Sequence, residues 1–301
     1  MTKTLYIVGN GFDLHHSIRS AYKAFGAFVK AHDSESYRLI ENYFPVDDEF
    51  WSDFEAGLAD FDADSLIENA SDFLTPYGAE DWKDSALHDY QFEIERVVRA
   101  LSSDLRVHFA RWIRQLTMPD PTSIRSRLRR LDASATFLTF NYTPTLVTLY
   151  GVEPSHVVHI HGSSADADTD LILGHGWNPK DRGSSNDGLN SGDTDTRVAD
   201  GNRIIDQYFE QTFKPTARVI AAHRSFFAAL RETQQILVMG HSLADVDLPY
   251  FSEIIRHVDS TNVRWRISYY HENHIPRLRQ QLVNLGGIPV DNVEFAQLAD
   301  L

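Results

Sequence analysis

The 301-residue sequence contains no cysteine. Disulfide bonds, thiolate zinc sites and cysteine nucleophiles are therefore excluded, and a reducing compartment suits the chain. It also lacks any apolar run that approaches the ~20 residues needed for a transmembrane helix. The first residues lead straight into a glycine-rich turn, which leaves no room for a signal peptide. We therefore expect a cytoplasmic protein that does not contact a membrane.

Positive charge is also scarce. The sequence has 28 Lys+Arg against 43 Asp+Glu, which gives a formal net charge of −15. Such a surface repels nucleic acids and anionic lipids, so we expect no nucleic-acid partner. The apolar content of 42% and the charged content of 24% are ordinary for a globular protein. A chain of this length can form one α/β domain with a large insertion.

Short apolar runs that are typical of strands recur along the chain, at residues 5–8, 136–140, 157–160, 235–239, 263–270 and 293–295. The run at 263–270 alternates and is expected nearer an edge. A helix is predicted directly after the first strand, because Ile18, Tyr22 and Phe25 recur at helical spacing.

Two longer segments differ from this pattern. Residues 34–131 carry apolar positions at helical spacing and predict a helical insertion, whereas residues 164–202 are rich in Asp, Ser and Gly and predict a flexible loop. The pattern as a whole predicts one Rossmann-like α/β domain over residues 1–301, with a mostly parallel sheet and flanking helices.

Small or polar residues follow four of the predicted strands, in the clusters Gly9-Asn10-Gly11, Asn141-Tyr142, His161-Gly162-Ser163 and Gly240-His241-Ser242. In open parallel sheets, ligands bind outside the carboxyl ends of the strands. A glycine turn before a helix favours a phosphate-bearing nucleotide as the ligand. We expect Gly9 and Gly11 to adopt positive φ and to approach that ligand closely. A carboxylate at such a site has to point away or cap the helix, and this applies to Asp13.

His161 is the best candidate for a general base, because neutral imidazole accepts a proton near pH 7. The amide of Asn141 could hold a water molecule or a ribose hydroxyl, or simply satisfy turn backbone groups. His159 and His161 fall on one face of a strand, which would allow a metal pair with His175 or His241. No further ligand follows at a recognised spacing, so no metal is expected.

Six short motifs, in this order along the chain, resemble those of the AbiH family of bacterial abortive-infection proteins. They are Gly9-Asn-Gly-Phe-Asp-Leu-His15, Trp51-Ser-Asp-Phe-Glu55, Phe140-Asn-Tyr-Thr-Pro-Thr-Leu146, His159-Ile-His-Gly162, Leu173-Gly-His-Gly176 and Gly240-His-Ser-Leu-Ala-Asp-Val-Asp247. The family in turn resembles the sirtuin-like NAD-binding fold. This resemblance implies an antiphage effector that binds NAD⁺ and hydrolyses its nicotinamide–ribose bond.

The resemblance also implies roles for individual residues. Asn141 and His161 would be the catalytic pair. The residues expected to contact the nucleotide are Gly9, Asn10, Gly11, Phe12, Asp13, Tyr142, Gly162, Gly240, His241, Ser242 and Asp247. Glu55 and His175 are additional candidates, Glu55 as a carboxylate that stabilises a sugar cation, unless it is an exposed helix carboxylate.

NAD⁺ is expected as a substrate, and a homo-oligomer or a defence-system partner protein as the macromolecular contact. Two other functions remain open from the sequence. One is a nucleotide-sensing or protein-interacting toxin without turnover. The other is a metal-dependent hydrolase built on the histidines.

Overall fold

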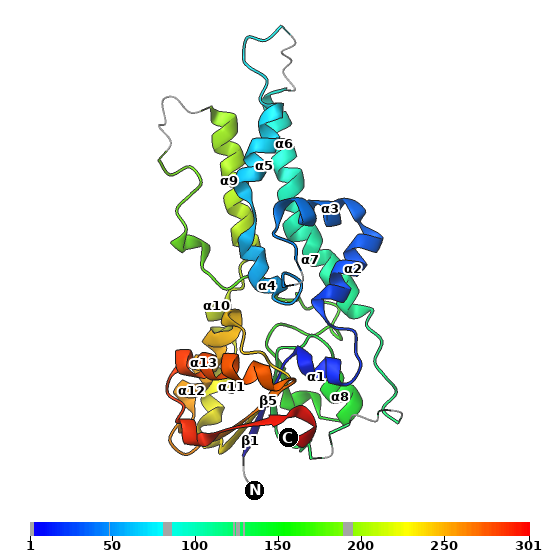
Figure 1. The fold of residues 1–301 in the computed structure, drawn as a ribbon, viewed down its shortest axis with the longest axis vertical. Coiled ribbons are helices and arrows are strands. Elements are labelled where there is room, and N and C mark those ends of the chain that lie inside the picture. The colour runs from blue at the N-terminus through cyan, green and yellow to red at the C-terminus, as the bar shows by residue number, and fades with distance from the viewer. Residues whose placement is uncertain are drawn as a thin grey trace. The chain divides into compact units, whose positions relative to one another are not determined.

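The computed structural model describes residues 3–47, 49–80, 86–122, 124, 127–128, 130–188 and 195–301 (Figure 1). The chain divides into two compact units. The first consists of Met1–Ala21, Trp112–Ile172 and Pro215–Leu301, and the second of Tyr22–Arg111 and Leu173–Lys214. Across the described ranges, no helix combines the length and the apolar character needed to cross a bilayer.

The first unit contains a six-stranded, entirely parallel sheet in the order β3-β2-β1-β4-β5-β6. Its strands are β1 (Thr4–Val8), β2 (Thr136–Thr139), β3 (Val157–His159), β4 (Gln235–Met239), β5 (Arg264–Tyr269) and β6 (Val293–Gln297). All six predicted strands and the Rossmann-like α/β class are therefore confirmed. β5 lies next to the edge strand β6, as its alternating sequence predicted.

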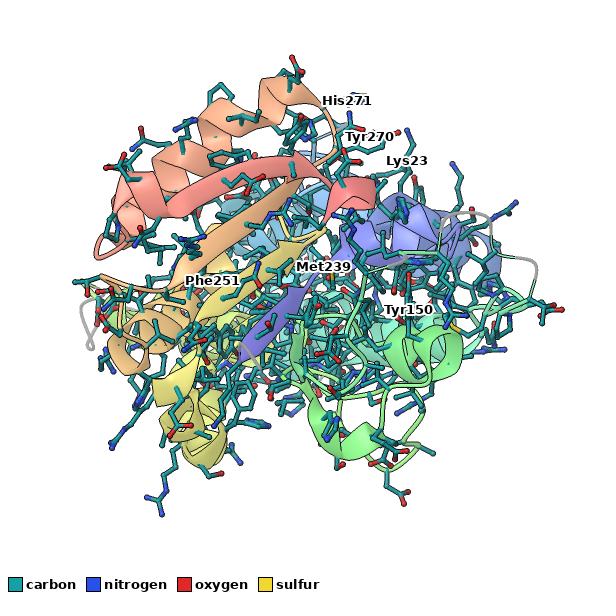
Figure 2. All side chains as sticks on the ribbon, turned by 90° about the horizontal axis from the view of Figure 1, so that it is seen from below. Lys23, Tyr150, Met239, Phe251, Tyr270 and His271 are labelled. Carbon is teal, nitrogen blue, oxygen red and sulfur yellow. The ribbon has the colours of Figure 1, made fainter. Side chains whose placement is uncertain are left out.

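Alternate residues of β1 enter two separate cores, as the pleat of a strand requires. Leu5 and Ile7 lie in a core that includes residues of α10 (Thr216–Ala222), α11 (Arg224–Ala229), α12 (Leu248–His257) and α13 (Ile275–Leu285). Tyr6 and Val8 lie in the other core, with residues of α1 (Asn10–His15) and α8 (Thr145–Tyr150). Figure 2 labels one residue from each core, Phe251 of α12 and Tyr150 of α8. The sheet therefore has helices on both faces, and its strand order reverses between β1 and β4.

Helical structure follows the first strand as predicted, but it is divided into two helices. α1 ends at His15, Ser17 has a φ of 63°, and α2 (Tyr22–His32) begins only after the break. The buried His16 ring fixes the end of α1, because its Nδ1–H donates to the Phe12 carbonyl at 2.7 Å and its Nε2 accepts from the Tyr150 hydroxyl at 2.6 Å. Burial lowers the pKa of His16, which favours this neutral form.

The second unit is helical in its described part. Its elements include α2, α3 (Ser34–Tyr43), α4 (Phe54–Gly57), α5 (Ala63–Ala70), α6 (Ala86–Arg99), a π-helical segment (Ala100–Asp104), α7 (Leu105–Arg114) and α9 (Thr196–Thr212). The helices predicted within residues 34–131 are thus present up to Arg114. The unit also includes Tyr22–Asp33 and the later segment Leu173–Lys214.

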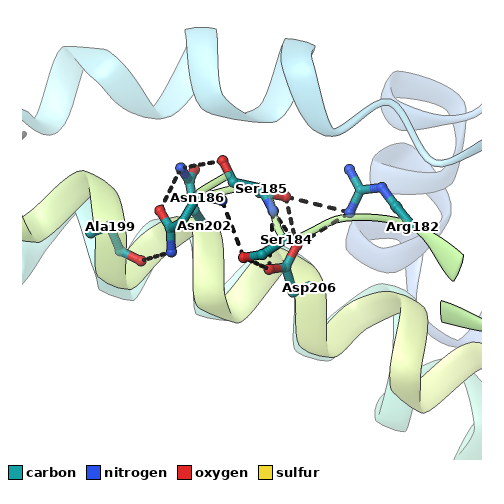
Figure 3. A network of polar contacts seen from close by, with 7 residues as sticks. All are labelled: Arg182, Ser184, Ser185, Asn186, Ala199, Asn202 and Asp206. Atoms are coloured by element: carbon teal, nitrogen blue, oxygen red, sulfur yellow. Dashed lines mark hydrogen bonds and ion pairs between the residues drawn. The ribbon is translucent and has the colours of Figure 1, made fainter. Parts of the chain in front are cut away.

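The polar segment 164–202 differs from its prediction at the C-terminal end. α9 begins at Thr196, because the carboxylate of Asp195 accepts the Arg197 backbone N–H at 2.9 Å and caps the helix. Before this helix, Ser184 and Ser185 are bonded to Asp206 of α9, with hydroxyl distances of 2.7 and 2.6 Å (Figure 3). Residues 189–194 of the predicted loop lie outside the described residues.

Candidate functional site

The glycine turn after β1 packs directly against the turn after β4. Gly9 donates its N–H to the Met239 carbonyl at 2.9 Å, and Gly11 donates to the Gly240 carbonyl at 2.7 Å. A Cβ on Gly9 would lie 2.7 Å from the His241 Cα, and one on Gly11 would lie 2.8 Å from the Gly240 carbonyl oxygen. The glycines are therefore required by the contact between the two turns at the point where the strand order reverses.

The backbone conformation of these turns differs from the expectation. Gly9 is extended, with a φ of −120°, and Gly11 lies within α1. Positive φ occurs instead at Gly240, with a value of 65°. The prediction of positive φ at Gly9 and Gly11 was therefore wrong. The close approach that these glycines allow is to another turn of the chain.

The side chains of the first turn are engaged within the unit. The Asn10 amide donates to the Ser20 carbonyl at 3.0 Å and accepts from the Ser20 hydroxyl at 2.5 Å. The ring of Phe12 is fully buried in the core, and the Phe12 N–H donates to the Gly9 carbonyl at 2.9 Å. These contacts fix the turn, so its conformation is set before any ligand arrives.

Asp13 points into the protein interior, and only 1% of it is exposed. Its carboxylate accepts hydrogen bonds from the Thr143 hydroxyl at 2.5 Å and the Thr145 hydroxyl at 2.7 Å. Burial raises the pKa of Asp13, while these hydroxyls and the Asn141 amide partly lower it. The carboxylate thus joins the β1 turn to the residues that follow β2.

Asn141 follows β2 and is the least satisfied polar side chain of the site. It is 6% exposed, and its carbonyl accepts the Nδ1–H of His159 at 3.0 Å. Its side-chain amide influences the pKa of Asp13, but neither Nδ2 nor Oδ1 forms a hydrogen bond of ordinary geometry with the described residues. A buried polar group without a partner costs about 1–3 kcal/mol, so an amide in this state calls for a functional explanation.

Asp247 lies between two imidazoles. Its Oδ1 is 3.7 Å from Nε2 of His161, and its Oδ2 is 3.4 Å from Nε2 of His241. His161 follows β3 and is 2% exposed, His241 follows β4, and Asp247 ends a short 3₁₀ turn before α12. The fold therefore brings His161 next to two predicted site residues, His241 and Asp247, of a motif about 80 residues later in the sequence.

Aromatic rings enclose the two imidazoles. The Phe140 ring is centred 5.3 Å from the His161 ring and 4.4 Å from the His241 ring. Tyr250 lies 5.5 Å from His161, and Phe251 lies 5.1 Å from His241. Such surroundings strengthen electrostatic interactions among the polar groups inside them.

Phe140, Tyr250 and Phe251 were not among the site residues predicted from the sequence. Signals for them were present, because Phe140 directly precedes Asn141. Tyr250 and Phe251 stand three and four positions after Asp247, which places them on the same side of a helix.

Residues 162–172 of the first unit pack against the backbone of Tyr142 and His161. Ser164 donates its N–H to the Tyr142 carbonyl at 2.7 Å, and the Tyr142 hydroxyl donates to the Ile172 carbonyl at 2.6 Å. Ile172 donates its own N–H to the His161 carbonyl at 2.9 Å. Gly162 has a φ of 89°, and a Cβ there would lie 2.9 Å from the carbonyl oxygen of Asp170. These contacts fix the backbone on either side of the buried imidazole, and the Tyr142 ring is centred 6.2 Å from the His161 ring.

The bacteriophage abortive infection AbiH family matches residues 5–269 of the chain. The chain belongs to this family. The matched range contains every residue of the site described above, and membership implies a function in bacteriophage abortive infection. A search of curated proteins finds no match to the chain.

Glu55 and His175, the remaining candidates in this AbiH chain, belong to the second unit. Glu55 accepts a hydrogen bond from the Tyr22 hydroxyl at 2.6 Å and forms an ion pair with the buried Lys214, so it is not an exposed helix carboxylate. The fully buried His175 contacts the Phe209 carbonyl through Nε2 at 3.1 Å, and burial lowers its pKa. Glu55 and His175 therefore both form their contacts within the second unit.

Histidine side chains are common metal ligands. Nδ1 of His159 donates to the Asn141 carbonyl, and burial lowers the pKa of His159. Within the described ranges, no three His, Asp or Glu side chains are grouped closely enough to hold a metal ion. Ser242, the last predicted contact residue, is exposed at the surface of the β4 turn.

Proposed function

We propose that this AbiH protein acts in abortive infection by hydrolysing the nicotinamide–ribose bond of NAD⁺, with Asn141 and His161 as catalytic residues. The observation that carries the proposal is the Asn141 amide. It is buried at the carboxyl end of β2, and neither of its polar atoms forms an ordinary hydrogen bond with the described residues. A ribose hydroxyl or an attacking water would supply this amide with a hydrogen bond of ordinary geometry.

The proposed reaction needs a base and an oriented water but little acid. Nicotinamide leaves as a neutral molecule, because it takes the electron pair of the broken glycosidic bond and cancels the charge on its ring nitrogen. The water oxygen forms the new bond to the ribose carbon, and a water proton passes to His161. Asn141 orients the water, and the aromatic surroundings of His161 exclude others.

The position of the site supports nucleotide binding. The strand order of the sheet is that of dinucleotide-binding folds, in which the ligand lies where the order reverses. We assign the nucleotide contacts to the two turns that meet there, residues 9–13 and 240–242, and to Tyr142, Gly162 and Asp247. His161 is buried, so groups around it have to move before the substrate can reach the base.

The test is nicotinamide release from NAD⁺, followed by chromatography. The variants are Asn141→Ala and His161→Ala, with Asn273→Ala and His274→Ala as controls at exposed positions of the same residue types. We expect release by the wild type and both controls, and a loss of about 100-fold or more in each site variant. Absence of release, even from concentrated or oligomerised wild type, would reject hydrolysis. Stabilisation by NAD⁺ without release would then favour a nucleotide sensor.

A further inference from the structure

The tautomer of His241 is fixed by the backbone of its own turn. Nδ1 of His241 accepts the N–H of Leu243 at 2.9 Å, so this nitrogen carries no proton. In the neutral ring the proton is therefore on Nε2, which is the atom that faces Asp247. Leu243 has a φ of 54°, an uncommon value for a residue with a side chain. The turn thus holds a strained conformation in which the imidazole presents a donor to the carboxylate.

Asp247 occupies the N-cap position of α12, but its side chain makes no capping hydrogen bond with that helix. Its two oxygens face the two Nε2 atoms instead, at 3.7 Å from His161 and 3.4 Å from His241. Asp245, the other carboxylate of the same 3₁₀ turn, accepts a hydrogen bond from Gln281 at 2.7 Å. The two carboxylates of this turn therefore have different partners: Asp247 faces the imidazoles, and Asp245 is bonded to Gln281.

The aromatic rings around this group limit competition from water. The Phe140 ring contacts both imidazoles. In such surroundings a carboxylate determines the orientation of a neighbouring imidazole more strongly than it does in water. The distances from Asp247 to the two Nε2 atoms are longer than those of ordinary hydrogen bonds. Hydrogen bonds between catalytic groups commonly shorten when the substrate binds.

We infer that Asp247 is a positioning residue, which holds His161 with its proton on Nε2, and that His241 secures Asp247 by donating to its other oxygen. In this arrangement Nδ1 of His161 is the nitrogen that accepts the water proton. The catalytic role of Asp247 and His241 rests on the proposed hydrolysis of NAD⁺. The inference adds to that proposal a role for Asp247 and His241 that acts through His161.

The first experiment compares Asp247→Asn with Asp245→Asn, which removes a carboxylate from the same turn without touching the imidazoles. We expect Asp247→Asn to lower kcat for nicotinamide release about 100-fold, because an amide in that place can hold the ring in the wrong tautomer. KM should change much less than kcat. This separates the positioning role from the nucleotide contact that is also assigned to Asp247, since loss of that contact alone would raise KM and leave kcat unchanged. Asp245→Asn should keep the wild-type kcat. An Asp247→Asn variant with wild-type kcat, or equal losses in both variants, would overturn the inference.

A second pair of variants examines His241. His241→Phe keeps a ring but removes the donor to Asp247, and we expect it to lower kcat. His241→Gln retains an N–H donor and should recover part of this loss. Equal activity of the two variants would contradict the donor role.

A readout that does not depend on activity is the ¹⁵N NMR spectrum of histidine-labelled protein, because protonated and unprotonated ring nitrogens have different shifts. Variants at positions 161 and 241 assign the signals. We expect both rings to carry the proton on Nε2, with the His161 signals changed by Asp247→Asn and unchanged by Asp245→Asn. A proton on Nδ1 of either ring would refute the arrangement. If the wild type releases no nicotinamide, the proposed hydrolysis fails, and this spectrum alone still decides the positioning role.

Discussion

Replacing Gly240 by alanine tests the contact between the turns after β1 and β4. Gly240 has a φ of 65°, and a Cβ there would lie 2.1 Å from the Phe12 nitrogen and 2.5 Å from the Gly11 carbonyl carbon. Gly151, at the end of α8, provides a matched control, because its φ is 66° and nothing lies within 4 Å of its Cβ position. Both substitutions have the cost of left-handed backbone, about 1–2 kcal/mol. Only Gly240→Ala adds overlap with a backbone that cannot move aside, for which overpacking costs give about 1–3 kcal/mol more.

Hydrogen exchange of peptides that contain β1 and β4 measures this difference where it arises. An additional 1–3 kcal/mol corresponds to exchange about 5–150-fold faster in Gly240→Ala than in Gly151→Ala. An increase in exchange rate that is confined to β1, β4 and the turns after them would show that the two turns stabilise each other. Equal exchange in the two variants would refute the reasoning, because the turns would then separate without cost.

Further predictions concern buried charges. Because burial raises the pKa of Asp13, the folded state binds its proton more tightly than the unfolded state. The wild type should therefore gain stability relative to Asp13→Asn as the pH falls from neutrality through the raised pKa towards about 4, and a constant difference in denaturant midpoints would contradict this. Thr145→Val removes one hydroxyl donor to that carboxylate and should cost about 1–3 kcal/mol in urea unfolding. Lys214→Met leaves Glu55 buried without its cation and should cost about 3–5 kcal/mol, much of which Glu55→Gln should restore in the double variant.

Much of the sheet could be predicted from the sequence, because each strand is a short apolar run that ends at a small or polar cluster. The same reasoning placed the residues that follow the strands, among them His161 and His241, at one edge of the sheet, since the carboxyl ends of parallel strands share that edge. The order of the strands was not predictable in this way. β1 lies between β2 and β4, and its partners are set by contacts between segments far apart in the sequence.

Other features depend on tertiary contacts that periodicity does not report. Ile18 and Phe25 are buried whether or not the helix is continuous, so their spacing could not reveal the break at Ser17. The break depends on the His16 ring and its bond to Tyr150, which is distant in sequence. Likewise the partner of Gly9 and Gly11 is a turn more than 200 residues away, and sequence spacing alone suggested a ligand in that place.

The placement of β1 has a consequence for synthesis of the chain on the ribosome. The first strand ends at Val8 and cannot complete its pairing until β4, which ends at Met239, has been made. At 5–20 residues per second, this delay amounts to roughly 10–50 s. During that time Gly9 has no opposing turn, and His161 has neither Asp247 nor His241 beside it. A growing chain therefore contains the first residues of the site long before the last ones, and the site can assemble only when the last third of the protein has been made.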